Sequence, residues 1–278
     1  MQCRSGIAAM RIRYRDKIDR KWRRLGDMSY KSKSISSKLT KNGWLLKHSR
    51  LQSYLPPMKP FNKRNLTAML NRYSVVYFKP TTGSGGNHIT RIRKQAQGFR
   101  ARSRSKNTFH SSIDSLFRQL NKQASLRPYL LQKGIQLAAA NGKPFDIRVM
   151  VQKTNKGKWI STALFTKIGK PGVVATNYNQ GGKIGFIRPT LSRAGYTADQ
   201  CSRMEFKLKQ MGADVGGCFD QHLRGFRELG LDVALDAARR PWILEVNTRP
   251  QFYPLKDMKD KSLYRRIVSY AKQYGRRK

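Results

Sequence analysis

The pattern of apolar and polar positions along the chain predicts two groups of β-strands. In the first group, an apolar run at 74–79 breaks at Pro80 into a glycine-rich loop, and a second strand follows at 88–92. In the second group, residues 146–152 and 159–166 alternate between polar and apolar side chains, which is typical of strands with one buried face. The polar residues between these two strands are expected to form a hairpin turn.

Apolar residues recur at helical spacing elsewhere in the chain. The expected helices cover residues 37–55, 66–73, 111–124, 197–229 and 261–274, and the pair Gly216-Gly217 is a candidate break in the fourth. Another strand is expected at 129–135. Strands that mix with helices and are joined mostly through hairpins favour an α+β fold with antiparallel sheets.

Acidic residues stand inside a predicted hairpin in the C-terminal part of the chain. Glu245, one of only three glutamates, lies in an apolar run, and Asp232 lies in the apolar run just before it. Because strand residues alternate between faces, Glu245 and Asn247 are expected to share one face, while Leu244 and Val246 enter a core. Burial of an unpaired carboxylate is costly, so these side chains need partners. Carboxylate and carboxamide oxygens suit Mg2+, a hard cation that shares its coordination shell with phosphate.

The same acids could be ordinary surface residues, because an isolated carboxylate on a strand usually faces solvent. Spacing alone leaves a metal site and an exposed face equally open. The distribution of acidic residues supports the site, since seven of the fifteen acids fall between Cys201 and Pro250, around the hairpin.

The net charge of +43 on 278 residues predicts salt-sensitive association with polyanions such as nucleic acid, anionic lipid or anionic polymer. The sequence carries no helix-turn-helix, zinc-finger or RNA-recognition signature, so binding to nucleic acid is expected to be non-specific. The three cysteines show no metal-ligand spacing, and their odd number argues for a reducing, cytoplasmic setting. No run of about 18 apolar residues occurs, so no membrane span is expected.

The loop after the strand at 74–79 has the composition of a phosphate-binding flap. Its glycines let backbone N–H groups turn inward and approach phosphate oxygens closely. Lys79, at the end of the strand, places a point charge within reach of the same phosphates. Most Gly/Ser turns only connect strands, and this one lacks the Walker spacing and opens no helix. Its value as a signal lies in its combination with the acidic hairpin downstream.

Several motifs, taken in order, resemble the ATP-grasp superfamily. They are Lys-Pro-x-x-Gly-Ser-x-Gly in a flap, Gln-x-Gly-Ile after a strand, Phe-Asp-Ile-Arg, and Asp…Leu-Glu-Val-Asn-x-x-Pro. The chain resembles more closely the YheC/YheD-type endospore coat-associated proteins, in residues 54–56, 76–86, 131–137, 144–151, 177–182 and 228–232. The resemblance implies an ATP-grasp fold, in which two α+β subdomains with antiparallel sheets grip a nucleotide between them.

For ATP, the resemblance implies contacts from lysines, a flap and a strand. The lysines contact the α- and β-phosphates, the flap covers the phosphates, the strand offers backbone groups to adenine, and a further loop lies near the same site. The residues implied in these roles are Lys38 (with Lys41 as a rival) and Lys79; Gly83, Ser84, Gly85 and Gly86; Gln132 and Lys133; and Asn177.

For metal binding and chemistry, the resemblance implies two further groups of residues. Asp232, Glu245 and Asn247 would hold one or two Mg2+ ions that bridge the β- and γ-phosphates. Arg148 and Arg249 would stabilise the transferring phosphoryl group or an acyl phosphate.

The chain departs from the family pattern at three places. His88 stands where the flap usually carries a glycine, and Lys167 stands where an arginine is common. A basic arm, residues 1–36, takes the place of the N-terminal domain that often precedes the ATP-binding part. The expected division is therefore this arm, a small subdomain with the flap at 37–137, and a C-terminal subdomain with the metal site at 138–278.

The resemblance implies an ATP- and Mg2+-dependent carboxylate–amine ligase that acts through an acyl phosphate on unknown carboxylate and amine substrates. It also implies a link to spore coat formation, with spore-coat components or an anionic polymer as further partners. Two alternatives remain open. One is a non-catalytic, ATP-binding structural protein of a spore layer, which would be stabilised by nucleotide without releasing ADP. The other is a polyanion-binding protein, whose binding would depend steeply on salt and ignore MgATP.

Overall fold

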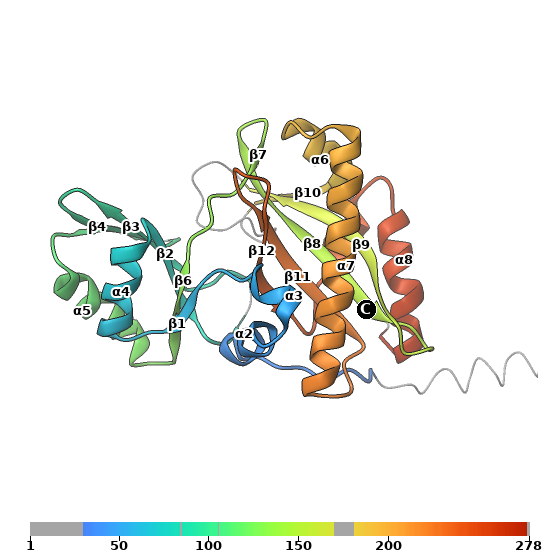
Figure 1. The fold of residues 1–278 in the computed structure, drawn as a ribbon, viewed down its shortest axis with the longest axis horizontal. Helices are drawn as coiled ribbons and strands as arrows, with labels where there is room; N and C mark the ends of the chain where they lie inside the picture. The colour runs from blue at the N-terminus through green and yellow to red at the C-terminus, as the bar shows by residue number, and fades with distance from the viewer. Residues whose placement is uncertain (1–29, 84, 105, 170–180, 277–278) are drawn as a thin grey trace, which may run out of the picture.

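The computed structural model describes residues 30–83, 85–104, 106–169 and 181–276, which form two antiparallel sheets flanked by helices (Figure 1). The first sheet has the strand order β1-β6-β2-β3-β4-β5, and the second has the order β10-β9-β8-β11-β12, with β7 paired to β8. The α+β class with antiparallel sheets that the sequence predicts is confirmed. None of the helices in the described ranges is long and apolar enough to cross a membrane.

The strands of the first sheet are β1 (Met58–Pro60), β2 (Val75–Pro80), β3 (Thr90–Gln95), β4 (Gly98–Arg102), β5 (Asn107–His110) and β6 (Tyr129–Lys133). Those of the second are β7 (Ala139–Ala140), β8 (Lys143–Lys153), β9 (Trp159–Ile168), β10 (Lys183–Phe186), β11 (Glu228–Leu235) and β12 (Pro241–Asn247). The helices are α2 (Lys38–Leu46), α3 (Ser49–Gln52), α4 (Lys63–Arg72), α5 (Ile113–Ala124), α6 (Ile187–Arg193), α7 (Ala198–His222) and α8 (Ser262–Ala271). Short 3-10 helices lie at Tyr253–Asp257 (η2) and Lys272–Tyr274 (η3).

Helices α4 and α5 cover one face of the first sheet (Figure 1). Leu116 and Leu120 stand one turn apart on α5 and pack, fully buried, in the same core as Val76 and Phe78 of β2. Because strand residues alternate between faces, this packing turns Tyr77 and Lys79 to the other face of the sheet. The packing of the helices thus decides which side of the sheet can meet a ligand.

Helix α7 lies across the second sheet and packs against β8 and β9 (Figure 1). The break expected at Gly216-Gly217 is wrong, because the helix runs without interruption from Ala198 to His222. A Cβ atom on Gly216 would lie 2.5 Å from the ring of Trp159, so this glycine allows close contact between helix and sheet. The expectation of helix as far as residue 229 is also wrong, since β11 begins at Glu228.

The segment before the first sheet packs with the second sheet. Leu45, Leu51 and Leu55 lie in the core that holds Val149 of β8, whereas sequence analysis grouped them with the first sheet. The N–H of Ile35 donates to Thr248 Oγ1 at 3.0 Å, so the described part of the basic arm lies against the residues that follow β12. The second sheet is therefore bordered by both ends of the described chain.

Candidate functional site

A cavity of about 310 Å³ lies between the two sheets. The first sheet contributes the side chains that α4 and α5 leave uncovered, and the flap between β2 and β3 contributes backbone. The second sheet contributes a set of charged residues, and the loop after β12 closes one side. Central residues of these walls are Tyr77, Lys79 and Gln132; Gly85, Gly86 and Ile89; Asp146, Arg148, Lys167, Asp232, Glu245 and Asn247; and Arg249, Gln251 and Tyr253.

The wall from the first sheet is built around the buried Lys79. Its Nζ donates to Gln132 Oε1 at 2.6 Å, and Gln132 Nε2 donates to the carbonyl of Leu244 at 3.2 Å, so one amide connects the two sheets. Burial lowers the pKa of Lys79 to about 8, although Glu245 opposes this shift. A lysine that lacks water in this way gains from a bound anion.

The wall from the second sheet is a row of charges that strand register brings together. Asp146 on β8 pairs with Lys167 on β9, and Arg148 on β8 pairs with Asp232 on β11. Arg148 Nε donates to Asp232 Oδ1 at 2.8 Å, and Lys167 Nζ lies 2.9 Å from both Asp146 Oδ1 and Asp232 Oδ1. Four charged side chains therefore form one continuous network on the face that lines the cavity.

Pairing keeps these buried groups ionised. Burial alone would raise the pKa of Asp232, but Arg148 and Lys167 outweigh it and hold that pKa well below its usual value. Burial likewise tends to lower the pKa of Lys167, but Asp146 and Asp232 raise it overall. The network thus offers fixed charges over the ordinary pH range.

A β-bulge in the acidic hairpin changes the face of one residue. Asp232 stands opposite Glu245 and Val233 opposite Ile243, so Leu244 is the extra residue on β12. The expectation that Leu244 enters the core is wrong, because the bulge turns it to the cavity and Ile243 is buried in its place. Val246 is buried, as expected.

The donor set at this hairpin fits Mg2+. Asp232 and Glu245 are opposed across the strands, and Asn247 Nδ2 lies 3.3 Å from Asp232 Oδ2, so two carboxylates and one carboxamide gather at one place. In the described ranges no group of three or more His, Cys, Asp or Glu residues could hold a metal ion. This two-carboxylate set therefore suits a cation that completes its shell with phosphate or water oxygens, as Mg2+ does.

The flap has a backbone that favours glycine. Gly83, Gly85 and Gly86 have φ angles of 95°, 75° and 71°. His88 also lies in the left-handed region, with φ of 58°. Lys38 Nζ donates to the carbonyl of Gly83 at 2.7 Å, which ties the start of α2 to the flap.

The sequence matches the YheC/D like ATP-grasp family over residues 27–277. This protein belongs to that family. Curated relatives are the endospore coat-associated proteins YheD and YheC of Bacillus subtilis (strain 168). YheD is 28% identical over 186 residues, which cover 64% of this chain and 40% of YheD. YheC is 23% identical over 220 residues, which cover 74% of this chain and 57% of YheC.

Solved structures share the ATP-grasp fold. D-cycloserine synthetase DcsG is similar with a TM-score of 0.54 and 13% identity, over 85% of this chain and 69% of DcsG. An ADP complex of PurK, N5-carboxyaminoimidazole ribonucleotide synthetase, is similar with a TM-score of 0.52 and 15% identity, over 86% of this chain and 52% of PurK. The expected ATP-grasp fold is confirmed, and the ADP complex supports nucleotide binding by this fold.

Most of the residues expected at the ATP-grasp site line the cavity: Lys79, Gly85, Gly86, Gln132, Lys133, Arg148, Asp232, Glu245, Asn247 and Arg249. Lys38 and Lys41 lie instead in a small neighbouring hollow that Glu245 also borders, with Lys38 Nζ 3.4 Å from Glu245 Oε1. Gly83 is connected to this hollow by the hydrogen bond that its carbonyl accepts from Lys38 Nζ. Ser84 and Asn177 lie outside the described residues.

Several lining residues of the cavity were not expected from the sequence, and Asp146 and Gln251 are two polar ones near Arg148. Asp146 belongs to the Phe-Asp-Ile-Arg motif, and its spacing of two from Arg148 on a strand was the signal that both share a face. Gln251 accepts from Arg148 Nη1 through its carbonyl at 3.2 Å, and no sequence signal identifies a backbone oxygen.

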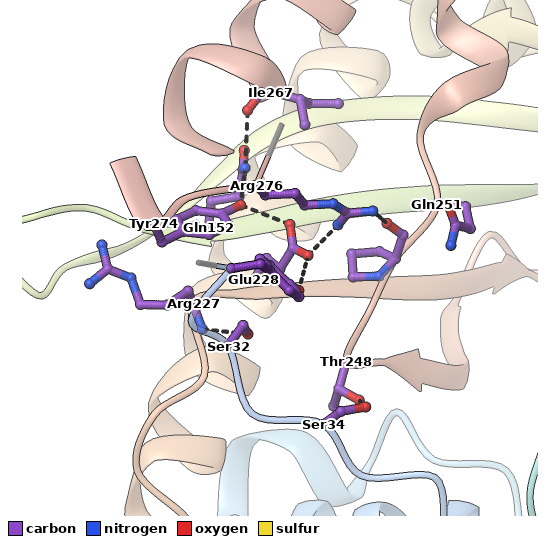
Figure 2. Close-up of polar contacts among 12 residues, drawn as sticks. Ser32, Ser34, Gln152, Arg227, Glu228, Thr248, Gln251, Ile267, Tyr274 and Arg276 are labelled. Atoms are coloured by element: carbon purple, nitrogen blue, oxygen red, sulfur yellow. Dashed lines mark hydrogen bonds and ion pairs between the residues drawn. The ribbon is translucent and has the colours of Figure 1, made fainter. Parts of the chain in front are cut away.

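A buried polar cluster supports the loop after β12 (Figure 2). Glu228 is fully buried and accepts from the hydroxyls of Tyr30 at 2.5 Å and Tyr274 at 2.7 Å. Arg276 pairs with Glu228 through Nη1 and donates from Nη2 to the carbonyl of Pro250 at 3.0 Å. The cluster thus joins both ends of the described chain to the loop that carries Arg249 and Gln251 into the cavity.

Proposed function

We propose that this protein is an ATP- and Mg2+-dependent carboxylate–amine ligase that acts through an acyl phosphate. The observation that carries the proposal is the single cavity that has Lys79 and the flap on one side and Asp232, Glu245 and Asn247 on the other. The ligase class rests on family membership and on the shared fold with two synthetases. The substrates of the whole protein are not implied, because the chain spans 40% and 57% of its two curated relatives.

The cations around the cavity bind and orient the triphosphate in this proposal. Burial lowers the pKa of Lys79 to about 8, and a phosphate beside its Nζ would stabilise the charged form of this lysine. Lys38 holds the flap by its bond to the Gly83 carbonyl, so that backbone N–H groups of the flap can turn to the phosphates.

The second sheet fixes the groups that face the transferring phosphoryl group. Asp232, Glu245 and Asn247 would hold Mg2+, which supplies charge neutralisation at the phosphate oxygens when bound. Arg148 is held from two sides, by Asp232 and by the Gln251 carbonyl, so its orientation needs no reorganisation during the reaction. Arg249 lines the same cavity from the loop after β12 and is assigned to the acyl phosphate.

The test is ADP and phosphate release by the purified protein with MgATP, screened against amino acids and acidic peptides. Glu245→Gln keeps the size of the side chain but removes its charge, and turnover is expected to fall about a hundredfold or more. Glu205→Gln is the matched control, because Glu205 on α7 pairs with Arg188 on α6 and does not line the cavity. Equal turnover by wild type and Glu245→Gln would refute the assignment.

A second candidate is an ATP-binding structural protein without turnover. It is favoured by the ion pairs of Asp232 with Arg148 and Lys167, because a metal ion would have to compete with both cations for this carboxylate. Stabilisation by MgATP without ADP release under any substrate would support this candidate. The names of YheD and YheC support a location at the spore coat for either candidate, and a spore-coat or anionic polymer partner remains part of the proposal.

A further inference from the structure

The first sheet has a basic surface on the face that α4 and α5 leave uncovered. Ile92 on β3 and Ala101 on β4 are buried in the core beneath those helices. Their neighbours in sequence therefore lie on the opposite face, and all four of these neighbours are arginines. We name this surface the arginine face, and it consists of Arg91, Arg93, Arg100 and Arg102.

Strand register places these arginines directly opposite one another. Arg91 pairs with Arg102, and Arg93 pairs with Arg100, in the antiparallel ladder between β3 and β4. Directly opposed like charges destabilise a pair of strands. Two such pairs side by side lower the stability of this sheet. Neutral polar residues at the same positions would face solvent equally well without that repulsion, so folding alone does not explain the arginines.

In the part of the chain that the structure describes, no acid forms an ion pair with the arginine face. The sequence contains no Asp or Glu from residue 28 to 113, and Asp114 lies on α5, on the other side of the sheet, where it pairs with Lys63 at 2.5 Å. Arg100 donates only to a neutral partner, Gln95 Oε1, at 3.3 Å. The face therefore presents four charges that an anionic ligand can neutralise.

An exposed aromatic side chain extends the arginine face. Phe109 on β5 pairs with Arg100 in the ladder between β4 and β5, so both lie on the same face. Half of Phe109 is exposed, whereas its neighbour His110 is buried on the helix side. The ring lies against Gly98, yet half of it stays open beside arginines that form no ion pair, which makes it a second sign of a ligand.

We propose that the arginine face, together with Phe109, binds single-stranded nucleic acid without sequence preference. Guanidinium groups bind phosphates through paired N–H donors, and an exposed ring on a sheet stacks on a base, which is how single strands are commonly held. An acidic polypeptide would engage the arginines but leave Phe109 without a role, so it is the less favoured occupant. The arginine face borders the nucleotide cavity, because Arg91 stands opposite Tyr77 of the cavity wall, but the proposal does not rest on the ligase reaction.

The test compares two double variants of equal charge by fluorescence anisotropy with labelled oligothymidylate of about 20 nucleotides. Arg93→Gln/Arg100→Gln removes an opposed pair from the arginine face. Arg118→Gln/Lys122→Gln removes the same charge from exposed positions on α5, on the other side of the same sheet. We expect the first variant to bind at least about tenfold more weakly at moderate salt and to lose about 1.4 from the slope of log affinity against log salt. We expect the second to change both quantities far less.

Phe109→Ala tests the class of the occupant. We expect it to weaken oligothymidylate binding by at least about fivefold without changing the salt slope, because stacking carries no counterion release. Polyglutamate of matched charge is expected to compete poorly and to be insensitive to Phe109→Ala. Equal losses in the two double variants would show attraction by the whole basic surface and overturn the proposal. Competition by polyglutamate as strong as that by the oligonucleotide, with no effect of Phe109→Ala, would overturn it in favour of an acidic polypeptide.

Two readouts keep these outcomes separate from folding and from the ligase. All of the substituted side chains are exposed, so thermal unfolding of the variants is expected to stay within a few degrees of the wild type. Stabilisation by MgATP is expected to be unchanged in every variant. Loss of that stabilisation in Arg93→Gln/Arg100→Gln would place these arginines in the nucleotide site and contradict a separate surface.

Discussion

At the scale of single residues, the lowered pKa of Lys79 makes the stability of the folded protein depend on pH. Burial lowers its pKa from 10.5 to about 8, so between these values the folded protein has released a proton that the unfolded chain keeps. Below pH 8 the folded protein carries a buried charge on Lys79, and this charge lowers the free energy of unfolding. As the pH rises from 8 towards 10.5 the folded protein loses that charge before the unfolded chain does, so the free energy of unfolding increases.

A bound phosphate favours the charged form of Lys79, so ADP binding should take up a proton near pH 8. We expect an uptake of about half a proton per ADP at pH 8 and almost none at pH 6.5, measured by calorimetry in buffers of different ionisation enthalpy. Lys79→Arg keeps the charge and removes the titration, so it should bind ADP without uptake. Wild-type binding that is independent of the buffer at pH 8 would contradict the role of Lys79.

Glu228 is the second residue whose environment makes a sharp prediction. It is fully buried with Arg276, Tyr30 and Tyr274 as partners, and burial together with Glu228 raises the pKa of Tyr30 to about 12. Glu228→Gln leaves the Arg276 guanidinium without its charged partner, and we expect a loss of about 3 kcal/mol in the free energy of unfolding by urea. Asp199→Asn, which breaks the exposed ion pair with Arg203 on α7, is expected to cost less than about 1 kcal/mol. Similar losses in the two variants would contradict the supporting role of the buried cluster.

At the scale of elements, two adjacent glycines of α7 should respond in opposite ways. A Cβ atom on Gly216 would lie 2.5 Å from the Trp159 ring, whereas one on Gly217 would meet nothing within 4 Å. We expect Gly216→Ala to destabilise the protein by about 1–3 kcal/mol through overpacking. Gly217→Ala should stabilise it by up to about 1 kcal/mol, because alanine favours the helix. Chemical denaturation of both variants checks the pair, and two changes of the same sign would mean that α7 does not lie against β9 through Gly216.

The same elements show what the sequence could and could not predict. The acidic hairpin was predictable because an isolated glutamate in an apolar run needs partners. The bulge at Leu244 was not, since one extra residue in a strand leaves no mark in a short pattern. Strands β4 and β5 were missed because both are short and bury one apolar side chain between them, that of Ala101, so the alternation that reveals a strand is weak. Glu228 was assigned to a helix because its buried partners, Tyr30 and Arg276, come from distant parts of the chain.

At the scale of the whole molecule, the site depends on both sheets and on segments far apart in sequence. The order of the motifs that carry Arg148 and Asp232 could be read from the sequence, but the register that places these two residues opposite each other could not. The cavity itself could not, because it requires the Gln132 amide of one sheet to meet the Leu244 carbonyl of the other. Sequence periodicity describes how each sheet is buried, but it holds no information about the distance between two sheets. Here the resemblance to a known family supplied what periodicity could not.

The net charge of +43 makes a final prediction about stability. Repulsion among an excess of like charges opposes a compact state, and added salt screens it. We therefore expect the midpoint of thermal unfolding to rise between about 0.02 and about 0.5 M NaCl, although salt weakens the surface ion pairs. Sodium sulfate at the same ionic strength separates screening from binding. Equal rises of the unfolding midpoint in the two salts indicate screening. A much larger rise of the midpoint with millimolar sulfate indicates that the anion binds at a specific site. A midpoint that falls with NaCl would mean that the screening of exposed ion pairs, such as Arg203 with Asp199, outweighs the relief of repulsion, because salt weakens exposed pairs far more than the buried pairs of Asp232 and Glu228.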